Sequence, residues 1–180
     1  MRCDTIINGD KIILRPMTYD DTDLIVNWRN RPFVKDKMII RNPFTVEGHH
    51  EWIRTMIDTG KVVQFIILDK EDNRPVGSTY FRDIDYDNEK AEFGVFIGET
   101  DAMGKGFGTE AAVLMLDYAF TVLKLHKIYL RVLSTNTAAE KSYLKAGFKR
   151  EAYLKDEYKI DGEFTDIIVM SIINGEENAS

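Results

Sequence analysis

The spacing of hydrophobic positions changes several times along the chain, and each change marks a predicted element. Short apolar runs typical of strands occur at residues 11–15, 62–68, 76–84 and 91–97. Polar turn residues separate the last three runs at 69–74 and 85–88. Consecutive strands joined by short polar turns favour an antiparallel meander, and we predict one here.

Two amphipathic helices are predicted between the first strand and the meander. Thr18 and Thr45 are residue types that favour the N-cap position, and each precedes an apolar stripe. The stripes recur at helical spacing: Leu24, Ile25 and Trp28 in the first helix, and Trp52, Ile53 and Met56 in the second.

The second half of the chain alternates helix and strand. A glycine-rich stretch after residue 97 leads into a helix, and an apolar strand follows at 127–133. A short helix capped by Asn136 ends at Gly147, and Asp161-Gly162 is a strong hairpin signal between strands at 151–160 and 163–173. The pattern predicts one mixed α/β domain over residues 1–180 with a strand–loop–helix–strand unit at its centre.

Composition narrows the functional classes. The chain has 180 residues, 44% of them hydrophobic, and a net charge of −6, which argues against a nucleic-acid partner because phosphate binding needs a basic face. The single cysteine, Cys3, excludes an intrachain disulfide, and with three histidines no metal site is expected. Neither a membrane-spanning run nor a signal peptide is evident, so we expect a cytoplasmic protein.

The stretch MGKGFGTEA, Met103–Ala111, carries the strongest chemical signal. Its three alternating glycines precede a predicted helix, and open backbone amides at a helix start form a phosphate cradle. It is not a Walker A loop, because Lys105 lies between the first two glycines. It is not a dinucleotide fingerprint either, because Thr109 stands where the third glycine belongs.

This stretch resembles the pyrophosphate-binding motif Q/R-x-x-G-x-G/A of the GNAT superfamily of N-acetyltransferases. A second block, Asn136 to Phe148, is similar to that family's N-x-x-A/S-x-x-x-Y-x-K-x-G-F signature. The order of elements also matches from about Lys11 to Ile173. The resemblance implies the GNAT fold, with a twisted, mostly antiparallel sheet. Met103 departs from the motif, which removes a side-chain contact but keeps the backbone amides.

The resemblance implies acetyl-CoA as co-substrate and places a set of residues around it. The end of the strand before the loop is expected to bind the pantetheine arm through its backbone, if the family's splayed strands are kept. Asn136 serves either as helix cap and cofactor contact or as cap alone. The expected cofactor-binding residues are Val95, Phe96, Ile97, Met103, Gly104, Lys105, Gly106, Phe107, Gly108, Thr109 and Asn136.

Two residues are candidates for the chemistry. Tyr143 occupies the position at which the family's tyrosine protonates the departing thiolate, and a phenol with a pKa near 10 can do this. The alternative is a tyrosine that only packs. Glu92, on the strand before the loop, is either the general base or water-ordering group, or a glutamate that points to solvent.

The acceptor amine stays open at this point. The two early helices wall the acceptor site in the family, which makes Trp28, Arg29, His49 and Trp52 candidate substrate-binding residues. The alternative is a tryptophan pair that packs the two helices together. The Leu14–Pro16, Asn27–Asn30 and Asp161–Asp166 segments are similar to the RimJ/RimL-like branch.

Three acceptor classes fit these features: a protein N-terminus, a polyamine or other small amine, and a nucleotide-linked amino sugar. The expected reaction is direct attack of the amine in a ternary complex. A homodimer is compatible with the resemblance, since many relatives are dimers. The alternative function is a CoA-binding regulatory or scaffold module that has lost catalysis, which the departure at Met103 favours.

Overall fold

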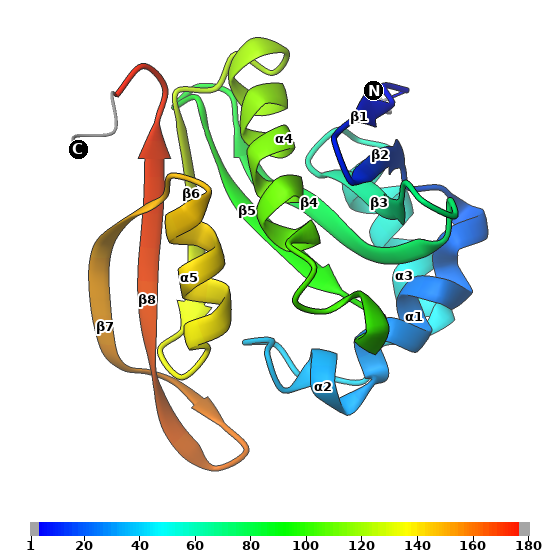
Figure 1. The fold of residues 1–180 in the computed structure, drawn as a ribbon. Coiled ribbons are helices and arrows are strands. Elements are labelled where there is room, and N and C mark those ends of the chain that lie inside the picture. The colour runs from blue at the N-terminus through cyan, green and yellow to red at the C-terminus, as the bar shows by residue number, and fades with distance from the viewer. Residues whose placement is uncertain (1–3, 177–180) are drawn as a thin grey trace.

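The structure is a computed structural model that describes residues 4–176, and its centre is an 8-stranded sheet (Figure 1). The strand order is β1-β2-β3-β4-β5-β6-β8-β7. The strands are β1 Ile7–Asn8, β2 Ile12–Pro16, β3 Val63–Asp69, β4 Pro75–Asp85, β5 Lys90–Ile97, β6 Lys127–Leu133, β7 Lys149–Ile160 and β8 Glu163–Ile173.

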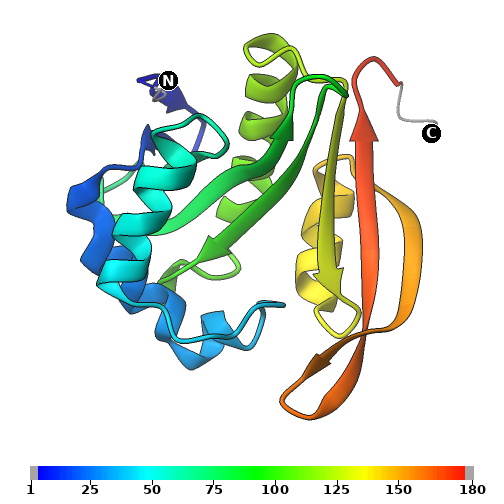
Figure 2. The same cartoon turned by 180° about the vertical axis from the view of Figure 1, so that it is seen from behind.

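Helices cover both faces of this sheet. The helices α4 and α5 lie on one face (Figure 1), whereas α1 and α3 lie on the other (Figure 2). Their bounds are α1 Thr22–Asn30, α2 Pro32–Lys35, α3 Val46–Trp52, α4 Phe107–Thr121 and α5 Thr137–Lys145. Short 3₁₀ helices lie at Tyr19–Asp21 and Thr100–Ala102, and a π-helical turn, Ile53–Ile57, continues α3. None of the described helices is long and apolar enough to cross a membrane.

Strand β3 shows how one strand serves both faces. Phe65 and Ile67 belong to the hydrophobic cluster beneath α4, which includes Met115, whereas Ile66 belongs to the cluster on the opposite face with Trp28. Successive side chains of a strand point to opposite faces, so a nearly continuous apolar run fills two cores. The fold is therefore a mixed α/β arrangement of three layers.

The sheet is antiparallel except where β5 meets β6. These two strands pair in parallel at only three positions, Lys90–Glu92 of β5 with Lys127–Tyr129 of β6. Beyond them β5 stays paired with β4 up to Ile97 but makes no further ladder pair with β6. The strands are thus splayed, and the backbone edge at the end of β5 faces an opening.

Most predicted elements are confirmed, with local differences at the helix starts. Thr18 precedes a 3₁₀ turn rather than α1 itself. Helix α4 begins at Phe107, within the glycine-rich stretch rather than after it, because Gly106 takes the N-cap position with φ 88°. Strand β1 and helix α2 were not predicted, since each is too short to show a period.

The predicted caps and turns are confirmed by their geometry. The Thr45 side chain accepts a hydrogen bond from the Gly48 amide, and the Asn136 side chain accepts one from the Ala139 amide. At the β7–β8 turn Asp161 and Gly162 have φ values of 52° and 93°. Two successive positive φ angles are the geometry for which Asp-Gly is selected in tight hairpins.

Candidate functional site

A cavity of about 830 Å³ lies where β5 and β6 diverge. The end of β5, the glycine stretch and the starts of α4 and α5 line one part of it. Residues of α1, α2, α3 and the segment between α2 and α3 line another part. The cavity therefore joins the predicted cofactor-binding residues to the helices predicted to wall the acceptor.

The glycine stretch forms an open cradle at the start of α4. Gly104 and Gly106 have φ values of 75° and 88°, and a Cβ added at Gly104 or Gly108 would meet no other atom within 4 Å. The first i to i−4 bond of α4 runs from the Glu110 amide to the Gly106 carbonyl, at 3.0 Å. The amides of residues 107–109 come before that bond and so have no acceptor within the helix, as is usual in a first helical turn. A helix start open to solvent, with its dipole, suits a pyrophosphate group.

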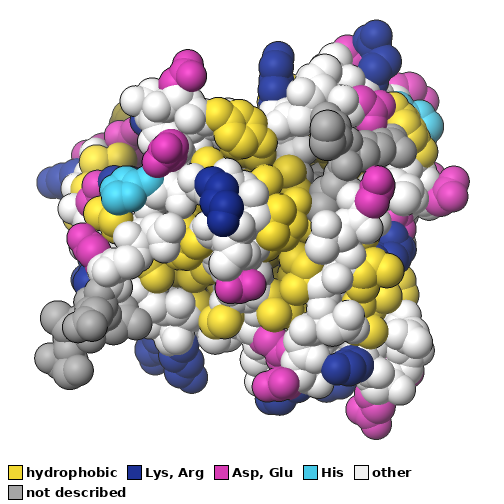
Figure 3. Space-filling model, turned by 90° about the horizontal axis from the view of Figure 1, so that it is seen from above, with side chains coloured by type: hydrophobic (Ala, Val, Ile, Leu, Met, Phe, Trp, Pro, Cys, Tyr) yellow, Lys and Arg dark blue, Asp and Glu magenta, His cyan; other side chains and the backbone are white. Residues whose placement is uncertain are grey.

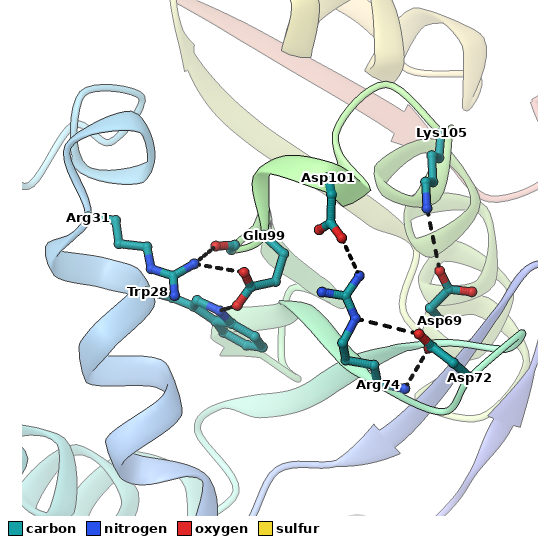
Figure 4. A network of polar contacts seen from close by, with 9 residues as sticks. Trp28, Arg31, Asp69, Asp72, Arg74, Glu99, Asp101 and Lys105 are labelled. Atoms are coloured by element: carbon teal, nitrogen blue, oxygen red, sulfur yellow. Dashed lines mark hydrogen bonds and ion pairs between the residues drawn. The ribbon is translucent and has the colours of Figure 1, made fainter.

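Ion pairs hold this loop to the neighbouring strands (Figure 4). Arg74 donates to Asp101 at 2.8 Å, and the Lys105 ammonium lies 3.8 Å from Asp69. The side chain of Lys105 therefore lies outside the cavity lining, although its backbone forms part of the loop. Met103 also lines the cavity and is 52% exposed, but its side chain has no N–H or O–H donor for a phosphate. The donors of the cradle are therefore backbone amides.

The other residues expected around the cofactor also line the cavity. They are Val95, Phe96, Ile97, Gly106, Phe107, Gly108, Thr109 and Asn136. The Thr109 and Ser142 hydroxyl oxygens are 2.7 Å apart, which joins the first turn of α4 to α5. The two motif blocks of the sequence thus meet at one place in the fold.

Tyr143 lines the same cavity from α5. Its side chain is 8% exposed and packs edge-on against Phe93, at 6.2 Å between ring centroids, and against Phe148, at 5.9 Å. Burial raises the pKa of Tyr143 above its ordinary value, and the charge of a nearby Tyr80 phenolate would add to this. The phenol therefore stays protonated at neutral pH and can donate a proton.

Glu92 lies in a charge cluster rather than in solvent. It is 3% exposed, and both of its carboxylate oxygens accept hydrogen bonds. Arg131 donates at 2.9 and 3.1 Å, and Arg82 donates at 2.8 Å. Burial works to raise the pKa of Glu92, but the hydrogen bonds and charges of the two arginines outweigh it and hold the pKa below its ordinary range. This geometry disfavours proton acceptance by Glu92 and excludes the alternative of a solvent-pointing glutamate.

Trp28 does not lie in the cavity lining. Its ring is fully buried, and its indole nitrogen donates to Glu99 at 2.7 Å, where Arg31 also donates to Glu99 at 2.9 Å (Figure 4). A Cβ on Gly98 would come within 2.3 Å of the Trp28 ring, so a glycine is needed beneath it. Trp28 packs α1 onto the sheet, with its ring 6.2 Å from that of Phe96. This is a packing role, but not the one left open by the sequence, in which a pair of tryptophans packs the two helices together.

The other three candidate acceptor residues do line the cavity: Arg29, His49 and Trp52. His49 is 1% exposed, and its Nδ1 lies 3.0 Å from the Thr22 hydroxyl. Its Nε2 is buried and has no hydrogen-bond partner among the described residues. Burial, followed by the charge of His50, lowers the pKa of His49 to about 4, so its imidazole is neutral at pH 7.

Several polar cavity residues were missed at the level of sequence, among them Tyr80, Arg82, Arg131 and Tyr158. Arg82 and Glu92 are direct cross-strand partners, so the register of the β4–β5 hairpin could have paired them. A β-bulge between Arg82 and Asp85 shifts that register, and the turn sequence does not reveal it. Arg131 donates to the Tyr158 hydroxyl at 2.7 Å, a contact between distant segments that has no sequence signal.

Comparison with known proteins gives consistent results. The family model described as acetyltransferase (GNAT) domain matches residues 11–149. The uncharacterized N-acetyltransferase p20 of Bacillus licheniformis is 32% identical over 171 residues, 93% of this chain and 95% of that protein. The spermidine N(1)-acetyltransferase of Vibrio cholerae is 36% identical over 110 residues, 61% of this chain and 62% of that protein. A crystal structure of spermidine N-acetyltransferase from Vibrio cholerae in complex with CoA and spermine aligns with a TM-score of 0.85 and 28% identity, covering 92% of this chain and 96% of that one.

Proposed function

The chain belongs to the GNAT family of acetyl-CoA-dependent N-acetyltransferases, and on that premise we propose that it acetylates the primary amine of a small molecule. One observation carries the proposal: a single cavity is lined by the glycine cradle, by Tyr143 and by the residues of α1 and α3. Donor and acceptor sites that share a cavity suit direct transfer between two bound substrates, because proximity supplies much of the rate.

The chain's own backbone accounts for cofactor binding in this proposal. The amides of residues 104–109 bind the pyrophosphate, and the unpaired edge of β5 from Val95 to Ile97 binds the amide-bearing arm. Acetyl-CoA supplies the acetyl group as a thioester. Because the glycine cradle is made of backbone, the methionine at position 103 does not remove it.

Tyr143 is the proposed general acid. Its raised pKa keeps the phenol protonated at neutral pH, and it also makes the phenol a weaker acid than tyrosine in water. The proton is therefore transferred only as charge develops on the sulfur of the breaking C–S bond, and the phenolate that forms takes a proton back readily. The only cysteine of the chain, Cys3, lies outside the described residues, so no described residue offers a thiol for a covalent acyl-enzyme. Glu92 was a candidate for the general base or a water-ordering group, and its two arginine partners favour a role in holding those arginines instead.

Spermidine is a specific candidate for the acceptor. Proteins of Vibrio cholerae and Escherichia coli similar to this chain are named spermidine N(1)-acetyltransferases, and one related structure was solved with CoA and spermine.

The Leu14–Pro16 and Asp161–Asp166 segments support the finer placement in the RimJ/RimL-like branch, for which a protein N-terminus is another candidate acceptor. A dodecameric structure of the Vibrio cholerae relative supports self-association, and a homodimer is the simplest form we propose.

A Tyr143→Phe variant tests the proposed chemistry. The variant loses the proton donor but keeps the ring that packs on Phe93, so turnover should fall by about 10²- to 10⁴-fold while acetyl-CoA still raises the melting temperature. Tyr86→Phe, on an exposed turn, is the matched control and should retain full turnover. Turnover of Tyr143→Phe within twofold of the original protein would remove Tyr143 from the mechanism.

A further inference from the structure

The charges that line the cavity differ in sign from those of the whole chain. The chain carries a net charge of −6, and charged side chains of both signs are scattered over the face seen in Figure 3. The lining instead contains one carboxylate, Glu92, among its described residues. Its cationic side chains are Arg29, Lys37, Arg82, Arg131, Lys141 and Lys145.

The single carboxylate is already neutralised. Glu92 forms ion pairs with Arg82 at 2.8 Å and with Arg131 at 2.9 Å, so this trio keeps a net positive charge. A polyamine carries several ammonium groups, each of which needs an acceptor oxygen or a carboxylate when it leaves water. Among the described residues, this cavity offers no carboxylate that is free to provide one.

Arg29 is a cation without an anion. No ion pair or hydrogen bond links its guanidinium to another described residue, and the Phe44 and Phe96 rings lie 5.2 and 5.9 Å from it. Burial is the largest cause that lowers the pKa of Arg29, and the positive charge of Arg82 lowers it further. The charge of Tyr80 acts in the opposite direction but does not outweigh these two effects. A half-buried guanidinium that receives only ring contacts is poorly compensated, and an anion from outside the chain would compensate it.

A second unpaired polar group lies beside Arg29. The His49 ring contacts the same Phe44 ring, at 5.7 Å between centroids, and its Nε2 is buried without a partner among the described residues. Since the imidazole is neutral, it can exchange one hydrogen bond with a polar ligand atom but cannot neutralise an anion. The guanidinium of Arg29 and Nε2 of His49 thus both belong to residues that line the cavity, and neither has a hydrogen-bond partner among the described residues.

We propose that the acceptor is a primary amine that also carries an anionic group, either a carboxylate or a phosphate ester, and that Arg29 binds this group. A guanidinium suits both groups because its fork of N–H donors matches two oxygens at once. Arg82 and Arg131 add positive potential from the sheet side of the cavity. This inference rests on the proposed function, because it concerns the acceptor part of the same cavity.

Calorimetric binding to the CoA-loaded protein tests the proposal with matched ligands. The pairs are glucosamine with glucosamine 6-phosphate, and 4-aminobutanol with 4-aminobutanoate, and spermidine is the polycation. We expect the member of at least one pair that carries the anionic group to bind ten times more tightly than the partner that lacks this group, and more tightly than spermidine. Preference within one pair identifies phosphate or carboxylate as the group. Spermidine binding more tightly than every anionic ligand, or no discrimination within either pair, would overturn the proposal.

An Arg29→Met variant shows whether this residue is responsible. Methionine keeps an unbranched apolar stem between the two rings, so the fold should persist, and the preference within the pair should disappear. Arg54→Met, at an exposed arginine paired with Glu51, is the matched control and should keep the preference. Unchanged discrimination in Arg29→Met would contradict the assignment of Arg29. Failure of CoA to raise the melting temperature would instead overturn the proposed function, which keeps the two failures distinct.

Discussion

Individual ionisable residues of the cavity owe their protonation states to burial and to their immediate neighbours. Burial keeps the Tyr143 phenol protonated, two guanidinium groups keep the Glu92 carboxylate ionised, and burial keeps the His49 imidazole neutral. A proton donor, a fixed anion and a neutral polar ring thus lie in one cavity at neutral pH. Such divergent shifts are common where side chains take part in chemistry or binding.

His49 gives the stability of the protein a specific pH dependence. Its pKa is about 4 in the folded chain and about 6.5 in the unfolded chain, so between these values the unfolded state binds the extra proton. The free energy of unfolding should therefore fall as the pH is lowered from 6.5 towards 4, with a contribution of roughly 3 kcal/mol from His49. Above about pH 6.5 His49 is neutral in both states, so its full contribution to the free energy of unfolding is present there.

Urea unfolding at pH 7.5 and pH 4.5 measures this contribution. A His49→Asn variant keeps a short polar group near Thr22 but cannot titrate, so it should lose less stability between the two pH values than the original protein does. His126→Asn, at an exposed position that does not contribute to the pKa of His49, should behave like the original protein. An equal loss in His49→Asn and the original protein would show that His49 does not titrate differently on unfolding.

At the scale of elements, the glycine loop and α4 combine two requirements. Gly106 takes a positive φ as the N-cap of α4, whereas Gly108 has an ordinary helical position beside open space. Gly106 is therefore needed for the backbone conformation at the helix start, and Gly108 leaves the cradle open for a ligand. The two roles separate in a substitution at Gly108.

A Gly108→Ala variant should leave the fold intact while weakening cofactor binding. No atom lies within 4 Å of the added methyl group, and alanine is the better helix former, so stability should stay the same or rise by up to about 1 kcal/mol. Gly108 lines the cavity, and a methyl group added there would occupy space that the cradle leaves open, so acetyl-CoA affinity measured by calorimetry should fall by about tenfold or more, equal to about 1.4 kcal/mol. Unchanged affinity would place the pyrophosphate elsewhere.

Elements with strong local signals could be predicted from the sequence. The meander, the strand at 127–133, the Asn136 cap and the Asp161-Gly162 hairpin all depend on periodicity or on a turn residue, and the structure confirms each. Short elements such as β1 and α2 could not be predicted, because they depend on tertiary pairing. The position of Trp28 is a related case, since a helical stripe does not show which of its residues face a cavity and which face the core.

The site was predictable where the family resemblance supplied a motif or a pair of helices. Three of the four candidate acceptor residues lie in the cavity lining, as that resemblance implies: Arg29, His49 and Trp52. The glycine cradle and Tyr143 lie in one cavity, as the two motif blocks suggest. The arginine pair around Glu92 was not foreseen, because Arg82 and Arg131 come from strands that lie on either side of β5 and 49 sequence positions apart. The bulge in β4 also shifts the register that would have paired Arg82 with its partner.

At the scale of the whole molecule, the cavity exists because the sheet divides between β5 and β6. Pairing over only three positions holds the two parts together, and their divergence leaves both a free strand edge and a space of about 830 Å³. The helices of one face contribute the cradle and the tyrosine, and those of the other face contribute Arg29 and His49. The central claim is that donor and acceptor meet in this space.

The most direct test is the rate of CoA thiol release from acetyl-CoA across a panel of amines. The panel includes spermidine, a peptide with a free N-terminus, a nucleotide-linked amino sugar, and the phosphate- and carboxylate-bearing amines used above. We predict amine-dependent release with at least one small primary amine, with the highest kcat/KM among those that carry an anionic group. Release that no small amine raises above the rate of acetyl-CoA hydrolysis, with acetyl-CoA still bound, would contradict the account and leave a CoA-binding module without transferase activity.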